Sequence, residues 1–176
     1  LVASIIKSTI LILLIFFHSN ISSEETTRYN PDDQGVLSIM YHRFNENKYP
    51  STNIRMNIFL EHIDAIKNNG FEFYNPKLFD EQFDKPKDNK KILLTVDDAF
   101  LSFYENAWPV LKKNEIPFIL FVSTEPIGKR GYMTWDQIKE IEKEKFAFIG
   151  NHSHTHEYLI DFSFADFKDD INKSIK

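Results

Sequence analysis

The residues best suited to metal chemistry lie in two short segments of the chain. One apolar run ends in the paired acids Asp97 and Asp98. A second apolar run leads into the segment 150–156, where His152 and His156 are four residues apart. Two imidazoles and one carboxylate form a typical set of three protein ligands for a divalent cation and leave a coordination position for water. The two segments therefore predict a metal site, with the second carboxylate available as a base.

The spacing of the histidines suggests how they would bind one ion. On a helical turn, residues four apart project from the same face, so His152 and His156 could both reach a cation while His154 points elsewhere. Ser153 stands where the protease pattern H-E-x-x-H has its glutamate, so the base must come from another segment. Each segment also has a structural explanation, because histidine pairs are often hydrogen-bonded in packed loops and an acid after a strand often caps a helix or turn.

The elements that would position these residues alternate between strands and helices. Apolar runs predict strands at 35–41, 71–74, 91–96, 118–122 and 146–150. Helical spacing predicts helices after Asn57 up to 68–70, from 75–76 through Phe79 and Phe83, at 100–113, at 135–143 and at 164–176. This alternation implies a mostly parallel sheet, either a barrel or an open sheet. The carboxyl ends of parallel strands gather at one face, so the acids and the histidines can meet there.

Local signals refine three of these helices. Asn57 is expected to cap the first helix, and Thr134 with Gln137 three residues later forms a capping-box pattern. Ser163 with Asp166 indicates another cap. Pro109 is expected to kink or break the helix at 100–113.

Composition limits the classes of function. The length of 176 residues fits one domain with a sizeable core. A net charge of −5 and a pI near 5.7 give no reason to expect a nucleic-acid partner. The chain has no cysteine, so a metal must be bound by His, Asp or Glu.

The first residues differ from the rest of the chain. An unbroken apolar stretch from Ile10 to Phe17 follows Lys7 and precedes polar residues, which is the pattern of a signal peptide. Residues 1–23 are predicted to be a signal peptide or an N-terminal anchor, and 24–34 a linker. The protein is therefore expected to be exported to the periplasm, cell envelope or medium.

The two chemical segments resemble motifs of the NodB-type polysaccharide deacetylases, carbohydrate esterase family four. The first family motif, T-F-D-D-G, is similar to residues 95–99, and the second, H-[ST]-x-x-H, is similar to 152–156. Segments 40–42 and 133–135 look like segments of the family branch that modifies exopolysaccharides. The resemblance covers 35–176 and implies a partial, distorted (β/α) barrel.

The resemblance also implies a reaction and its residues. Asp98, His152 and His156 would bind one divalent metal ion, usually Zn²⁺, with Co²⁺, Ni²⁺ and Mn²⁺ as alternatives. Asp97 would be the general base that deprotonates the metal-bound water. The reaction would be removal of N-acetyl groups from a polysaccharide that contains N-acetylglucosamine, and no protein partner is predicted.

Substrate contacts are expected from aromatic and polar residues near the strand ends. Tyr132 and Trp135 are candidates for stacking on a sugar, as is Tyr41, with core or rim packing as the alternative. His42 lies at a strand end on the same expected face, whereas His18 and His62 are interpreted as structural.

Two features depart from the family pattern. Ala99 replaces the glycine of the first motif, which matters if the turn requires a positive φ angle. The later motifs, which supply an arginine, an oxyanion donor and a general-acid histidine, follow the helix on which this chain ends, so the sequence is expected to be incomplete at its C-terminus. The alternatives are an inactive carbohydrate-binding or scaffold fragment of the same fold, and a metal amidohydrolase that acts on small amides.

Overall fold

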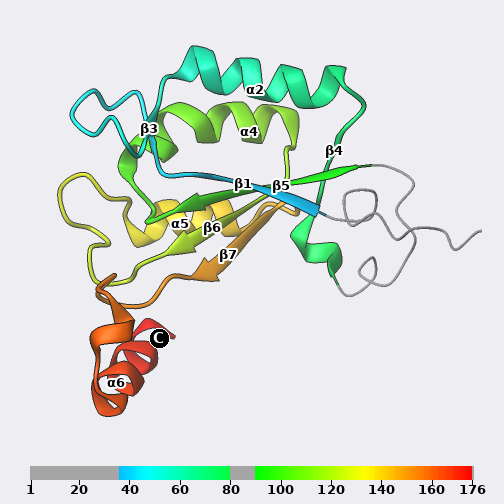
Figure 1. Cartoon of the computed structure of the whole chain (residues 1–176). Helices are drawn as coiled ribbons and strands as arrows, with labels where there is room; N and C mark the ends of the chain where they lie inside the picture. The colour runs from blue at the N-terminus through cyan, green and yellow to red at the C-terminus, as the bar shows by residue number, and fades with distance from the viewer. Residues whose placement is uncertain (1–35, 80–89, 176) are drawn as a thin grey trace, which may run out of the picture.

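The structure, a computed structural model, describes residues 36–79 and 90–175 (Figure 1). The predicted signal peptide or anchor at 1–23, the linker at 24–34 and the expected helical position Phe83 lie outside the described residues. None of the described helices is long and apolar enough to cross a membrane.

A parallel sheet forms the centre of the structure (Figure 1). Four strands run in the order β1-β5-β6-β7, and β4 pairs with the first two residues of β5. The strands are β1 (Val36–Tyr41), β4 (Glu72–Phe73), β5 (Lys91–Asp97), β6 (Phe118–Val122) and β7 (Ala147–Asn151). A separate parallel pair consists of β2 (Arg43–Phe44) and β3 (Asn53–Ile54). The five predicted strands are thus confirmed, and with them the α/β class.

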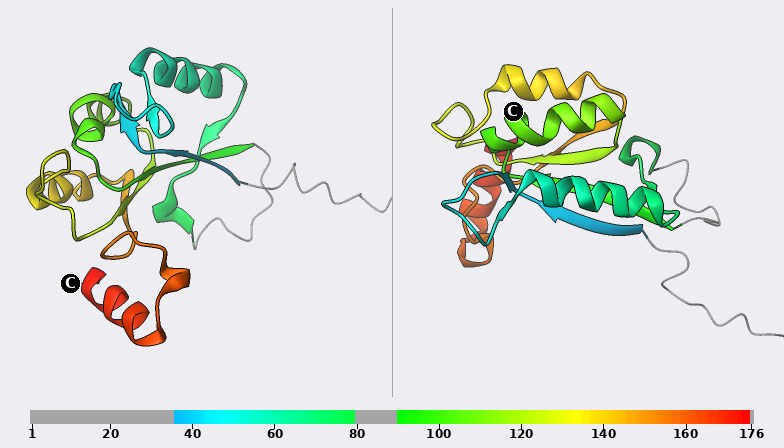
Figure 2. Two further views of the ribbon diagram at one scale, coloured as in Figure 1. Left: turned by 60° about the vertical axis from the view of Figure 1, so that its left-hand side comes forward. Right: turned by 90° about the horizontal axis from the view of Figure 1, so that it is seen from above.

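Three helices pack on one face of the sheet (Figures 1 and 2). They are α2 (Met56–Asn68), α4 (Trp108–Asn114) and α5 (Trp135–Glu142). Alternate strand residues face them and form the core, among them Leu94, Val96, Phe118 and Leu120. The helices contribute apolar side chains to the same core: Phe59, Ile63, Ile66, Trp108, Leu111, Ile138 and Ile141. Burial of this continuous apolar surface is the main contribution to stability.

A fourth helix, α6 (Phe164–Ser174), lies apart from the other three, beyond the carboxyl ends of the strands (Figure 1). Its predicted cap is confirmed, since the Ser163 side chain accepts a hydrogen bond from the Asp166 N–H. The capping box is likewise confirmed, with Thr134 and Gln137 bonded reciprocally at the start of α5. Both signals depend on side chains three residues apart, and such local geometry is encoded directly in the sequence.

Other helix ends differ from the prediction. Arg55, in place of Asn57, occupies the N-cap of α2, and its side chain makes no capping hydrogen bond. Pro109 does not end the helix, but the irregularity expected there is present as a π-helix, η2 (Phe103–Ala107), which directly precedes α4 and leaves the proline in its first turn. A proline is tolerated there, where backbone N–H groups have no partner within the helix. Two short 3₁₀ helices complete the described elements: η1 (Pro76–Leu78) and η3 (Leu159–Asp161).

The second face of the sheet is only partly covered by the described residues. The pairing registers place Met40, Thr95, Ile119 and Phe148 in one row across the four strands. Met40 and Phe148 are 59% and 42% exposed. Among the described residues the sheet is open, with β1 and β7 at its edges, so the expected barrel is present as an open, parallel segment.

Candidate metal centre

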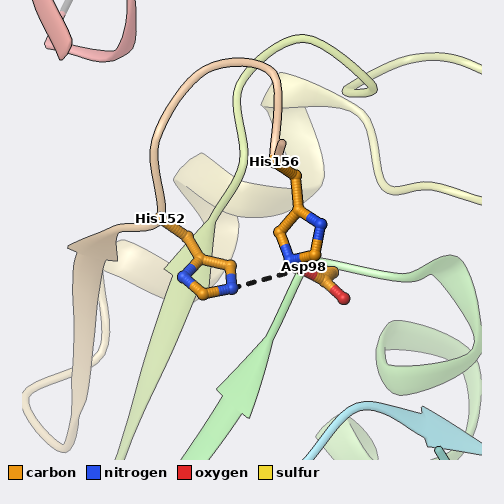
Figure 3. Close-up of side chains that lie close together, drawn as sticks. All are labelled: Asp98, His152 and His156. Carbon is orange, nitrogen blue, oxygen red and sulfur yellow. Dashed lines mark ion pairs between the residues drawn. The ribbon is translucent and has the colours of Figure 1, made fainter. Parts of the chain in front are cut away.

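Three side chains from distant parts of the sequence converge at the carboxyl end of the sheet (Figure 3). Asp98 follows β5, and His152 and His156 lie in the loop after β7. The Nε2 atoms of His152 and His156 are 3.4 and 3.1 Å from Oδ1 of Asp98. One ligand atom from each residue lies within 4.8 Å of the other two. The structure therefore brings together the three residues that the sequence predicts as metal ligands.

The chemistry of this cluster fits a divalent cation. Oδ1 of Asp98 is buried and accepts no hydrogen bond among the described residues. A buried carboxylate oxygen that accepts no hydrogen bond is costly. A cation at the centre would satisfy all three atoms, and one carboxylate with two imidazoles is a common set for zinc and related metals.

A strained turn positions Asp98. Asp98 and Ala99 have φ angles of 73° and 53°. Few residues other than glycine adopt this conformation without cost, so the family glycine that Ala99 replaces would fit here. The turn is held by a hydrogen bond from the Met133 N–H to the Ala99 carbonyl at 2.9 Å. The substitution is thus accommodated in a positive-φ turn with its methyl group fully buried.

The histidine loop is not a helical turn, which corrects the geometric reason given for the pair. Residues 152–156 are irregular, and Ser153 and His156 have φ angles of 66° and 61°. Ser153 stabilises the loop because its hydroxyl accepts a hydrogen bond from the His156 N–H at 3.2 Å. His154 points elsewhere, as expected, and its Nδ1 lies 2.7 Å from the hydroxyl of Thr124.

Asp97 and His42 lie beside the three converging residues. Asp97 is 7% exposed, and burial raises the pKa of its carboxyl group, with nearby His152 and His42 opposing the shift. Nε2 of His42 is 4.0 Å from Oδ2 of Asp97. A carboxylate whose pKa is raised is better suited to accept a proton in catalysis. The pair therefore offers a base and a second titratable group beside the predicted metal.

A cavity of about 530 Å³ adjoins Asp98 and His156. Tyr132, one of the predicted substrate contacts, lines this cavity. Arg43 also lines it and was not predicted; its guanidinium lies 3.3 Å from the ring centre of Phe100 and is bonded to Glu46 at 2.9 Å. The sequence contains no signal for Arg43, because the residue lies in β2, a strand of two residues that is too short to show a hydrophobic pattern.

The other aromatic candidates lie elsewhere. Trp135 is 43% exposed and does not line this cavity. Tyr41 belongs to the core, in agreement with the alternative that it packs there and does not stack on a sugar. Its hydroxyl lies 3.0 Å from Nδ1 of His62. His62 thus has the structural role expected of it. A second cavity, of about 710 Å³, adjoins His152 and His156 on the side of Tyr158.

Comparisons with known proteins agree with this site. A family model described as polysaccharide deacetylase matches residues 84–176, which is more than half of the chain. The protein YxkH from Bacillus subtilis (strain 168) is named as a polysaccharide deacetylase and is 30% identical to this chain. The match covers 69% of this chain and 42% of YxkH. A poly-beta-1,6-N-acetyl-D-glucosamine N-deacetylase from Staphylococcus aureus (strain MSSA476) is 24% identical over 90% of this chain and 64% of its own.

The fold is also similar to that of solved structures. IcaB from Ammonifex degensii matches with a TM-score of 0.67 and 26% identity, over 80% of this chain and 66% of that one. The chain thus spans less than two thirds of the length of these relatives.

Proposed function

The chain belongs to the polysaccharide deacetylase family, and on this premise we propose that it takes part in hydrolysing N-acetyl groups from a polysaccharide that contains N-acetylglucosamine. The relative from Staphylococcus aureus is named for such a polymer, which supports this class of substrate. The observation that carries the proposal is the convergence of Asp98, His152 and His156 beside the buried carboxylate of Asp97.

Asp98, His152 and His156 would hold the metal, for which we propose Zn²⁺. When bound, a divalent cation polarises the acetyl carbonyl and lowers the pKa of water. The protein contributes the ligand set and its orientation. The turn at Asp98 and the loop at Ser153 are both held by hydrogen bonds, so the ligands are positioned before substrate arrives.

Asp97 would act as the general base, taking a proton from the water that attacks the acetyl carbon. Its buried position and raised pKa suit this role. We further propose that His42, a predicted substrate contact whose Nε2 lies 4.0 Å from Oδ2 of Asp97, donates a proton to the amine nitrogen as the C–N bond breaks.

The cavity beside Asp98 would receive the sugar. Arg43 and Tyr132 line it from two different segments, and they can contact the hydroxyl groups and the face of a sugar ring. We extend the family domain to residues 35–176 and propose export by residues 1–23, because a cell-envelope polymer lies outside the cytoplasm.

The test is to measure bound metal and acetate release together. The full chain would be loaded with Zn²⁺ and assayed on oligomers of β-1,4- and β-1,6-linked N-acetylglucosamine, with a His152→Ala, His156→Ala variant as control. Stoichiometric metal and acetate release in the wild type, both lost in the variant, would support the proposal. Metal binding without acetate release would favour the scaffold alternative, and release from small non-sugar amides alone would favour an amidohydrolase.

A further inference from the structure

The loop that carries both histidine ligands depends on external support. Ser153 and His156 have positive φ angles of 66° and 61°. Such conformations are disfavoured for L-residues other than glycine, asparagine and aspartate, and they persist where surrounding contacts hold the backbone in place. The source of the support therefore bears on how precisely the two imidazoles are aimed.

One buried carboxylate of α6 makes three hydrogen bonds to this loop, and groups of residues 122–125 make others. Asp170 is 3% exposed. Its Oδ1 accepts a hydrogen bond from the His154 N–H at 2.8 Å, and its Oδ2 accepts from the Thr155 N–H at 2.9 Å and from the Thr155 hydroxyl at 2.6 Å. Burial would raise the pKa of Asp170, but the bonds from His154 and Thr155 outweigh it and hold that pKa below its usual value. The carboxylate is thus ionised and fully engaged with the backbone between the two ligands.

The way α6 is oriented supports the same role. Its first residue, Phe164, and its C-cap, Ile175, are 81% and 71% exposed, whereas Asp170 and Ser174 are buried. Nδ2 of Asn151, at the start of the loop, donates to the carbonyl and to the hydroxyl of Ser174 at 3.1 and 2.7 Å. The polar side chains of the helix therefore contact the histidine loop at its start and between its two histidine ligands.

We propose that Asp170 is a positioning residue of the metal centre. By fixing the backbone at His154 and Thr155, it holds His152 and His156 so that their Nε2 atoms converge on Asp98. The inference rests on the proposed function to the extent that a metal binds these three ligands. Groups that orient metal ligands typically change metal affinity by about 10- to 100-fold when removed.

The experiment compares Asp170→Asn with Asp169→Asn in the full chain. Asp169 is the neighbouring acid on the same helix, and its exposed side chain pairs only with Lys173 among the described residues, at 2.6 Å. Zn²⁺ affinity would be measured by competition with a chromogenic chelator, and the absorption spectrum of the Co²⁺ form would report ligand geometry. We expect Asp170→Asn to weaken Zn²⁺ binding by about tenfold or more and to alter the Co²⁺ spectrum, with Asp169→Asn within twofold of wild type.

Circular dichroism of the metal-free variants would establish that they fold. If Asp170→Asn did not fold, Thr155→Val would remove one donor to the carboxylate and should weaken Zn²⁺ binding severalfold. A folded variant with wild-type affinity and spectrum would overturn the inference. The measurement requires no turnover, so a wild type that binds metal but releases no acetate would refute the proposed activity alone, whereas a wild type without metal would refute both.

Discussion

At the scale of single residues, Asp98 lies buried with one carboxylate oxygen that accepts no hydrogen bond among the described residues. Asp98→Asn removes the negative charge while keeping the shape of the side chain. We expect this variant to lose Zn²⁺ affinity by at least about 100-fold. The free energy of unfolding of the metal-free variant should equal that of metal-free wild type or exceed it by about 1 kcal/mol, because a buried charged oxygen that accepts no hydrogen bond is destabilising.

Urea denaturation at pH 8 in the presence of a chelator would test this. Wild type with added Zn²⁺ provides the control and should be more stable than its metal-free form. A metal-free Asp98→Asn protein clearly less stable than metal-free wild type would show that Asp98 has another stabilising contact.

A substitution at Asp97 would distinguish an effect on catalysis from an effect on metal binding. Asp97→Asn keeps the size of the side chain but cannot accept a proton at neutral pH. We expect Zn²⁺ affinity within a few-fold of wild type and acetate release reduced by about 10²- to 10⁴-fold, the usual contribution of a general base. Parallel metal titration and acetate assays would measure both, and retention of full activity would exclude Asp97 as the base.

The site was predictable where residue type and position after a strand were sufficient. The convergence of Asp98, His152 and His156 was predictable because candidate metal ligands are restricted to few residue types and parallel strands end at one face. Their loop geometry was not predictable, since positive φ at Ser153 depends on hydrogen bonds from distant segments. Asp170 was missed for the same reason, because an acid on an amphipathic helix is ordinarily exposed.

At the scale of elements, two helices with the same kind of N-cap contact different parts of the structure. Ser163 caps α6, which contacts the histidine loop, and Thr134 caps α5, which packs on the core. Replacing either cap by alanine should cost about 1 kcal/mol. We expect Ser163→Ala to speed amide hydrogen exchange in α6 and in the loop 152–156, and to weaken Zn²⁺ binding by roughly two- to fivefold, because α6 opens locally.

Thr134→Ala is the matched control. It should speed exchange within α5 and leave Zn²⁺ affinity unchanged. Equal effects of the two variants on metal binding would mean that loss of overall stability, and not release of α6, weakens the site.

The elements themselves followed closely from the sequence. Apolar runs such as 118–122 specify buried parallel strands, and the Thr134 and Ser163 caps specify helix starts. The π-helix before Pro109 was not predictable. It adds one residue to a helical turn, and whether that turn fits depends on the elements packed around it. The cap of α2 also departed from propensity, since Arg55 makes no side-chain bond there.

At the scale of the whole molecule, the sequence predicted a parallel sheet and, from the continuous apolar run at 91–96, a strand buried on both faces. Residues of β5 and β6 are apolar at successive positions, which is typical of strands buried on both faces. The described residues bury one face under α2, α4 and α5, while the other carries the row from Met40 to Phe148. Which face is covered depends on contacts among distant elements, so no single apolar run can indicate it.

This second face leads to a prediction for the protein in solution. Met40 and Phe148 are 59% and 42% exposed on the outer strands of one sheet face, and Ile119 lies between them in the row. Contiguous exposed apolar surface binds hydrophobic dyes and promotes association. We expect Met40→Lys with Phe148→Lys to lower the fluorescence of bound anilinonaphthalene sulfonate severalfold and to reduce concentration-dependent association in sedimentation velocity.

Leu60→Lys is the control, because Leu60 is also 42% exposed but lies on α2, away from this face. Dye binding that falls with Leu60→Lys and persists in the double variant would mean that the sheet face is not the exposed apolar surface of the protein.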